Sequence, residues 1–74
     1  MHLVAQRVIN KCGGIRNTAY IIGISVQSVY KWTIPRSKGG TNGLVPQKRQ
    51  IELMVAAKNH GIHLTHEDFF PKLD

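Results

Sequence analysis

This chain of 74 residues contains little cysteine, few acidic residues and no long hydrophobic run. Cys12 is its only cysteine, which excludes an intrachain disulfide and a zinc site built from several cysteines. No apolar run approaches the ~18 residues of a membrane-spanning helix, and residues 1–14 lack the uninterrupted apolar core of a signal peptide. These absences predict a cytoplasmic protein without a membrane partner.

Acidic side chains are scarce: four Asp and Glu stand against ten Lys and Arg, which gives a formal net charge of +6 and a sequence pI near 10.0. The imbalance is uneven along the chain. Residues 1–64 carry nine basic residues and one acidic residue, whereas residues 65–74 carry one basic and three acidic residues. Such a charge distribution favours a polyanionic partner that contacts the larger, basic part of the chain.

Groups that could carry catalysis are few. A chain this short forms one domain, residues 1–74, and cannot enclose a substrate cavity on all sides. Neither a Ser-His-Asp arrangement nor paired carboxylates stand out, and Glu52 is interpreted as an ion-pair partner for Lys48 or Arg49. We therefore predict that the protein is not an enzyme and has neither catalytic residues nor a cofactor.

Three histidines recur every three residues near the end of the chain, which raises the question of a zinc site. They are His60, His63 and His66, and Glu67 and Asp68 follow them. Gly61 breaks the helix between the first two, so the spacing does not define a common face. The sequence therefore predicts no metal site here.

The most informative stretch runs from residue 18 to residue 32, with Gly23 at its centre. Apolar residues three apart flank this glycine, and they are Ala19 and Ile22 on one side and Val29 and Trp32 on the other. This spacing predicts two short helices that each have one apolar face. Between them, Gly23 can end the first helix in the left-handed conformation, Ile24 can fill the corner, and Ser25 can cap the next helix. The pattern predicts a helix-turn-helix motif over residues 16–33.

The remaining periodicity predicts a compact, all-α fold of four to five helices. Helices are expected over residues 2–12, from 16 or 17 to 22, from 25 to 32 or 33, and from 46 to about 60. A short closing turn is expected after the last helix, and the two together make up the segment 46–71. In the first helix, Arg7 and Lys11 are expected to face water. In the closing turn, Thr65 and Asp68 have capping-box spacing, and Phe69 or Phe70 is expected to reach the core.

The fourth predicted helix has a clear apolar periodicity. Its expected inward face consists of Ile51, Met54, Val55 and Lys58, widened toward the core by Leu53, Ala56 and Ala57. Pro46 fits the first turn, where its missing N–H would have had no partner.

Residues 34–45 form a loop in this interpretation, because three glycines and a proline disrupt both helical and strand periodicity. The Asn42-Gly43 pair favours a hairpin turn, but its flanks are too short and polar for convincing strands. Arg36 and Lys38 place positive charge just after the helix-turn-helix motif. We therefore interpret the loop as a clamp on the DNA backbone, with a mobile connector as the alternative.

The second helix of the motif would lie in the major groove and present the residues that do not face the core. These candidate base-reading residues are Val26, Gln27, Ser28, Tyr30 and Lys31. Gln27 can contact adenine through two hydrogen bonds, Val26 can contact a thymine methyl group, and Lys31 can reach guanine or a phosphate. Alternatively, Ser28 only helps to cap the helix and Tyr30 only packs on the surface.

Donors near the motif are candidates for contacts with the phosphate backbone. They are Arg16, Asn17, Thr18, Arg36, Lys38, Gly39, Gly40 and Thr41. The first two also lie at a helix start, where free N–H groups and the helix dipole favour an anion. Residues 38–41 are similar to a phosphate-binding glycine loop, but the strand and the following helix start of a nucleotide-hydrolysis motif are missing.

Several segments resemble phage Cro repressors and the Cro-like YdaS family of small bacterial and prophage regulators. The resemblance is carried by Gly14, Thr18-Ala19, Ile22-Gly23-Ile24-Ser25, Ser28-Val29, Lys31-Trp32, Gly43-Leu44-Val45-Pro46 and the ending Leu64-Thr65, Glu67-Asp68-Phe69-Phe70-Pro71. It covers nearly the whole chain, although the segment 35–43 is longer than the corresponding link in compact members.

This resemblance implies a DNA-binding domain that regulates transcription, often as a homodimer on a two-fold operator, in the bacterial cytoplasm and on the nucleoid. By position, Val26, Gln27, Ser28 and Lys31 fall where the family reads bases, and residues 16–17 fall near its backbone contacts. We therefore expect a sequence-specific repressor of double-stranded DNA. Two alternatives remain: an excisionase-like protein that bends DNA, and an antitoxin-like module that binds a protein partner through residues 62–74.

Overall fold

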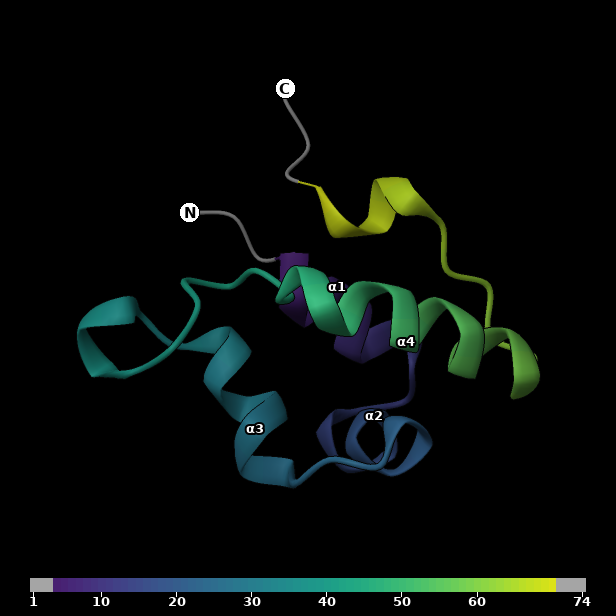
Figure 1. The fold of residues 1–74 in the computed structure, drawn as a ribbon, viewed down its shortest axis with the longest axis horizontal. Coiled ribbons are helices and arrows are strands. Elements are labelled where there is room, and N and C mark those ends of the chain that lie inside the picture. The colour runs from purple at the N-terminus through teal and green to yellow at the C-terminus, as the bar shows by residue number, and fades with distance from the viewer. Residues whose placement is uncertain (1–3, 71–74) are drawn as a thin grey trace.

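The computed structural model describes residues 4–70, and within this range it contains four α-helices and three short 3-10 helices. The α-helices are α1 (Val4–Lys11), α2 (Ile15–Ile22), α3 (Val26–Tyr30) and α4 (Gln47–Asn59) (Figure 1). The 3-10 helices cover Lys31–Thr33, Arg36–Lys38 and His66–Phe69. Because the described part of the chain contains no strand, the predicted all-α fold is confirmed and the hairpin alternative is excluded.

The helix boundaries differ from the predicted ones by one to three residues. Residues 2 and 3 of the first predicted helix lie outside the described range. The helix α2 begins at Ile15 rather than at residue 16 or 17, after Gly14. The third predicted helix is divided, because the α-helical hydrogen bonding of α3 gives way to a tighter turn at Lys31–Thr33.

The turn between α2 and α3 has the geometry that its three residues predict. Gly23 takes the left-handed conformation with φ 70°, and the Ile24 N–H donates to the Ala19 carbonyl at 3.1 Å. The Ser25 hydroxyl then accepts a hydrogen bond from the Ser28 N–H at 3.1 Å and caps α3. These bonds fix the direction in which α3 leaves α2.

The hydrophobic core draws on every α-helix, on the loop before α4 and on the closing turn. It consists of Ala5, Val8, Ile9, Cys12, Ala19, Val29, Trp32, Val45, Leu53 and Phe69. The small side chain of Ala19 lets α2 and α3 pack closely, and Ile24 packs against the same core from the turn. Val29 and Trp32 are buried as predicted, so the opposite side of α3 is left for solvent.

The inward face predicted for α4 is wrong in part. Ile51 and Val55 are 68% and 59% exposed, whereas Leu53 and Ala57 are fully buried. The buried stripe therefore follows the spacing of Leu53 and Ala57, with Met54 packed at its edge. The helix has apolar residues on two faces, and periodicity alone did not identify the face that meets the core.

The closing turn (His66–Phe69) is attached to α1 by a clasp that consists of Arg7, Lys11 and Asp68. The Lys11 ammonium group lies 2.8 Å from the Asp68 carboxylate, and the Arg7 guanidinium donates to the Asp68 and Phe70 carbonyl groups at 3.0 Å each. Lys11 is exposed as expected, although its ammonium group pairs with Asp68, whereas Arg7 is half-buried because its guanidinium reaches across to this turn. Of the two aromatic residues, Phe69 is buried and Phe70 is exposed.

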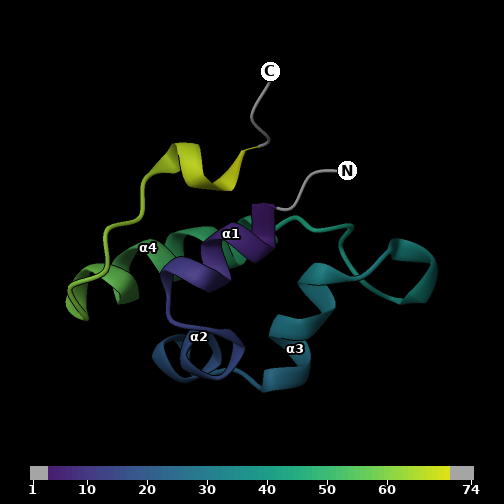
Figure 2. The same ribbon diagram turned by 180° about the vertical axis from the view of Figure 1, so that it is seen from behind.

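The closing turn and the pair α2 and α3 lie on opposite sides of α1 and α4, and the loop after Thr33 projects from the side of the domain (Figures 1 and 2). The molecule measures 33 × 30 × 19 Å. Among the described helices, none is long and apolar enough to cross a membrane.

Candidate nucleic-acid interface

One face of α3 and its 3-10 extension carries four of the five candidate base-reading residues. Val26, Gln27, Tyr30 and Lys31 are all exposed, and Val26 and Tyr30 are 42% and 53% exposed. At 3.6 residues per turn, these four positions span about 140° of the helix circumference, opposite the buried Val29 and Trp32. The structure thus brings these side chains together on a single surface.

Ser28 lies at the edge of this face and takes part in the helix cap. It is half-buried, and its hydroxyl lies 2.9 Å from the Ser25 hydroxyl while its N–H donates to the same oxygen. Its hydroxyl group is therefore already used in the capping arrangement that the sequence offered as an alternative.

The start of α2 offers one free charged group rather than three donors. Arg16 is exposed in the first helical turn, where the N–H groups have no intrahelical partner. Asn17 is also exposed, but its amide donates to the Cys12 carbonyl and ties α2 to the end of α1. Thr18 is fully buried and donates to the Gly14 carbonyl at 2.7 Å, so its prediction as a backbone contact is wrong.

The glycine-rich loop is an ordered structure whose N–H groups bond to carbonyls of the loop itself and of Lys31 just before it. The Gly39 N–H donates to the Arg36 carbonyl at 3.0 Å, the Gly40 N–H to the Pro35 carbonyl at 3.0 Å, and the Thr41 N–H to the Lys31 carbonyl at 3.0 Å. The Thr41 hydroxyl also contacts the Trp32 and Leu44 carbonyls. A cradle of N–H groups for phosphate is therefore absent at residues 39–41, and these three residues shape the loop instead.

Two further contacts hold the loop against the rest of the domain. The Asn42 side chain accepts a hydrogen bond from the Arg36 N–H at 2.8 Å, and the Ala5 N–H of α1 donates to the Gly43 carbonyl at 2.7 Å. Arg36 and Lys38 are exposed on the 3-10 turn of this loop. What the loop offers an anion is thus two cationic side chains on an ordered support.

Outside α3 and the glycine-rich loop, the described residues contain an ion pair on α4 but no cluster of side chains that could bind a metal ion. Arg49 and Glu52 form the predicted ion pair at 2.7 Å. Within residues 4–70, no group of three or more histidine, cysteine, aspartate or glutamate side chains is arranged to hold a metal ion. Cys12 is fully buried, and burial raises the pKa of its thiol although a hydrogen bond with Thr18 lowers it.

Sequence reasoning missed two features of this region. The first is the role of Asn42, whose left-handed conformation and hydrogen bond organise the loop, although the Asn-Gly pair was a signal for a turn. The second is that N–H groups of the loop are bonded to carbonyls of the loop and of Lys31, which follows from the folded path of the loop and has no signature in the composition.

Comparison of the chain with protein-family profiles, with curated proteins and with solved structures finds no significant match.

Proposed function

We propose that this chain is a sequence-specific, double-stranded DNA-binding regulator of transcription, a repressor of the Cro-like kind, which reads the major groove with α3. The observation that carries the proposal is the exposed face of α3, with Gln27 and Lys31 adjacent to Val26 and Tyr30 on an ordered two-helix support. A chain with a net charge of +6 also matches a polyanion. The resemblance of the motif to Cro-like regulators points to the same function.

Each side chain on this face has a chemical role in base recognition. Gln27 presents an amide that matches the N6 and N7 edge of adenine, and Lys31 presents a donor for guanine or a phosphate. Val26 offers a methyl surface for thymine, and Tyr30 adds a hydroxyl group and an aromatic face. Ser28 contributes through the cap that orients the first turn of α3.

Contacts with the phosphates are assigned to three cationic side chains around α3, namely Arg16, Arg36 and Lys38. All three are exposed, and they lie before and after α3 in the chain. Such contacts set the register of the protein on DNA without reading its sequence. Because a single short helix reads only a few base pairs, we propose that two copies occupy a two-fold operator.

Selection of bound sequences from a random pool of double-stranded DNA tests the proposal. A preferred motif with two-fold symmetry is the expected result, because two copies of α3 would read two half-sites. If the bound pool is no more biased than the starting pool, the chain is not a sequence-specific regulator.

Substitution of Gln27 by alanine should flatten the preference at one position of each half-site, by about 1–3 kcal/mol, because the paired hydrogen bonds to adenine are lost. Binding to single-base operator variants measures this effect. Gln47→Ala, an equivalent change at the exposed first turn of α4, is the control and should leave the preferences intact. An unchanged profile for Gln27→Ala would remove this residue from the reading surface.

Substitution of Lys38 by alanine should weaken binding to all sequences alike and reduce the slope of log K against log salt concentration by about 1, because one phosphate contact is lost. Lys58→Ala removes the same charge near the end of α4 and should leave the slope almost unchanged. Equal slopes for Lys38→Ala and the unmodified chain would show that the loop is a spacer.

A further inference from the structure

The outer part of the glycine-rich loop, residues 34–42, forms a narrow projection that we call the loop tip. Hydrogen bonds close it from one side to the other: the Asn42 N–H donates to the Ile34 carbonyl at 2.9 Å, and the Gly40 N–H donates to the Pro35 carbonyl at 3.0 Å. The loop tip projects from the side of the domain, beyond the end of α3 (Figures 1 and 2). It is therefore an ordered unit attached to the end of the candidate reading helix.

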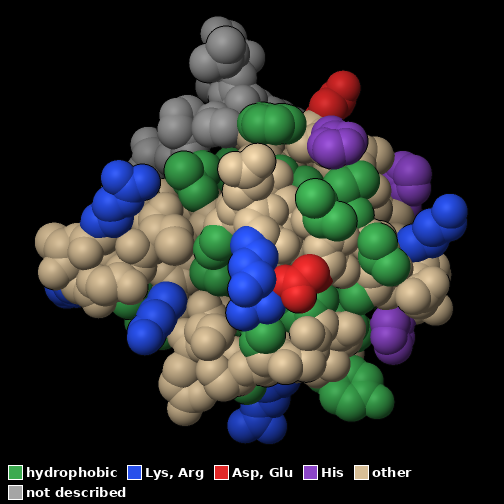
Figure 3. All heavy atoms as spheres, in the orientation of Figure 1, with side chains coloured by type: hydrophobic (Ala, Val, Ile, Leu, Met, Phe, Trp, Pro, Cys, Tyr) green, Lys and Arg blue, Asp and Glu red, His purple; other side chains and the backbone are tan. Residues whose placement is uncertain are grey.

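The loop tip carries little bulk apart from two cationic side chains. Between residues 35 and 42, Arg36 and Lys38 are the only long side chains, and the others belong to Pro, Ser, Gly, Thr and Asn. Both are exposed, and neither takes part in an ion pair within residues 4–70. In Figure 3, Lys and Arg side chains lie on the side from which the loop tip projects, and the acidic side chains visible on this face lie elsewhere. A slim, positively charged projection of this kind matches a narrow polyanionic groove.

The length of α3 and its 3-10 extension places the loop tip relative to bound DNA. In a helix-turn-helix complex, the N-terminal residues of the second helix contact the base edges. From Gln27 to Thr33 the chain rises about 10 Å, which is similar to the ~8.5 Å depth of the major groove. With Gln27 at the bases, Thr33 would reach the level of the phosphates. The loop tip leaves sideways from this point rather than along the axis of α3, so it would cross the DNA backbone toward the neighbouring minor groove (Figure 1).

Arg36 is the side chain best prepared to enter that groove. Its N–H donates to the Asn42 side-chain oxygen at 2.8 Å, and Pro35 before it has extended backbone geometry, so the backbone at Arg36 is fixed. Its guanidinium is planar and more weakly hydrated than a lysine ammonium group, and the strong negative potential of a narrow minor groove attracts it. Runs of A·T pairs have such a groove.

We propose that the loop tip places Arg36 in the minor groove beside the site that α3 reads, at a run of A·T pairs, while Lys38 contacts the adjacent phosphates. The proposal rests on the proposed function of α3 and gives Arg36 a more specific role than a phosphate contact. In the minor groove A·T pairs present only acceptors, whereas G·C pairs add the amino group of guanine, which is a donor and would repel the guanidinium. Sequence preference therefore extends beyond the bases that α3 reads.

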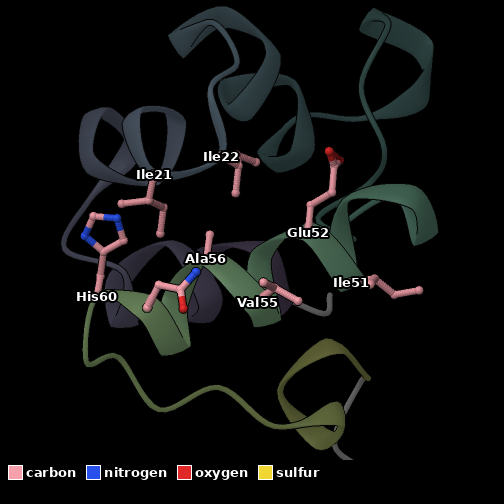
Figure 4. A pocket seen from close by; sticks show the side chains of 8 residues that line it. Ile21, Ile22, Ile51, Glu52, Val55, Ala56 and His60 are labelled. Atoms are coloured by element: carbon pink, nitrogen blue, oxygen red, sulfur yellow. The ribbon is translucent and has the colours of Figure 1, made fainter.

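Binding to operator variants that differ only in the flanking pairs tests this proposal. Changing the flank from A·T to G·C should weaken binding of the unmodified chain at least ~5-fold, and Arg36→Ala should reduce this difference to less than ~2-fold. Lys38→Ala removes the same charge from the same loop tip and should keep the flank preference. Arg49→Ala removes an arginine of α4, whose partner Glu52 lines a hollow between α2 and α4 (Figure 4), and serves as the control outside the loop tip.

Base analogues in the flank identify the groove that is read. Inosine·cytosine pairs keep the minor-groove pattern of A·T but have the major-groove pattern of G·C, and diaminopurine·thymine pairs do the reverse. We expect inosine·cytosine flanks to bind within about twofold of A·T flanks, and diaminopurine flanks to bind at least ~5-fold more weakly. The opposite order would place the contact in the major groove and overturn the proposal.

These measurements distinguish failure of this proposal from failure of the proposed function. A central motif with unbiased flanks, or an equal flank preference in Arg36→Ala and the unmodified chain, would overturn the role of Arg36 and leave α3 as the reading helix. Retention of the central motif by Arg36→Ala would show that this variant is folded. The absence of any preferred motif would contradict the regulator function, and the role of Arg36 would be overturned with it.

Discussion

The Asp68 carboxylate connects α1 with the start of the closing turn. One oxygen accepts a hydrogen bond from the Thr65 N–H at 2.9 Å and the other pairs with Lys11 at 2.8 Å. Burial alone would raise the pKa of Asp68, but the hydrogen bonds from Lys11 and Thr65 and the charge of Lys11 together lower it below its ordinary value of 3.8. The folded state therefore favours the ionised carboxylate.

The lowered pKa of Asp68 makes stability depend on pH in acid. The stabilisation is complete well above the ordinary pKa of 3.8 and is lost as the pH falls through the lower pKa of the folded state. Asp68→Asn should lower the free energy of unfolding by about 1–3 kcal/mol at pH 7 and by less at pH 3. Urea denaturation between pH 2.5 and about pH 7 measures the difference.

Glu67→Gln is the matched control for this prediction, because Glu67 is the adjacent acidic residue and is exposed. It should leave the pH dependence nearly unchanged. A constant difference between Asp68→Asn and the unmodified chain at all pH values would mean that ionisation of Asp68 does not contribute.

At the scale of residues, the sequence predicted hydrogen bonds and ion pairs between residues close in the chain and missed those between distant residues. The Thr65–Asp68 spacing, the Ser25 cap and the Arg49–Glu52 pair are separated by three residues, and each is confirmed. The contacts of Lys11 with Asp68 and of Arg7 with the same turn cross 57 and 61 residues. Long flexible side chains give no sequence signal for such partners.

At the scale of elements, the loop between Thr33 and α4 shows how a glycine-rich segment can be ordered. Gly40 lies so close to the Ile34 and Lys31 carbonyls that a Cβ atom there would overlap with both. Its N–H, together with those of its neighbours, bonds to carbonyls within the loop or at the end of α3. The position of Arg36 and Lys38 therefore depends on this close packing.

Substitution of Gly40 by alanine should force the loop away from the end of α3. We expect a loss of more than ~1 kcal/mol in unfolding free energy, since backbone atoms rather than a flexible side chain must move. Amide exchange at Thr41 and Asn42, whose N–H groups bond to Lys31 and Ile34, should accelerate. Ser37→Ala on the exposed 3-10 turn serves as control, and equal exchange in both variants would argue against tight packing at Gly40.

The helices and the turn between α2 and α3 were well predicted, but the face of α4 that packs against the core was not. Gly23 and Ser25 determine a turn through local chemistry, so α2, α3 and the burial of Val29 and Trp32 followed from the sequence. For α4, apolar residues on two faces left the choice to packing against other elements. The exposed face of α3 was accordingly predictable, whereas the exposure of Ile51 and Val55 on α4 was not.

At the scale of the whole molecule, Cys12 lies in the core, so solvent reaches its thiol only when the core opens. It is fully buried at the end of α1, and burial raises the pKa of its thiol. Its reaction with a thiol reagent therefore reports opening of the core rather than a local property of the side chain.

We expect Cys12 in the folded chain at pH 8 to react at least ~100-fold more slowly than in denaturant, because only opened molecules expose the thiol. The rate of the thiol reaction is measured from the absorbance of the chromophore that the thiol reagent releases. In a Cys12→Ser background, Ser37→Cys places a thiol on the exposed loop turn and should react at nearly the unfolded rate. Equally fast labelling of Cys12 would show that the core opens readily.

The clasp between α1 and the closing turn also affects the rates of folding and unfolding. The contacts of α1 with α2 and of α2 with α3 join segments close in sequence, whereas the clasp joins Lys11 and Asp68, which are 57 positions apart. The entropy of closing such a loop is lost only when distant segments meet, so local helix pairs are expected to form first. Interactions that form after the transition state slow unfolding without accelerating folding. The clasp would thus set the lifetime of the folded domain more than the speed at which the domain forms.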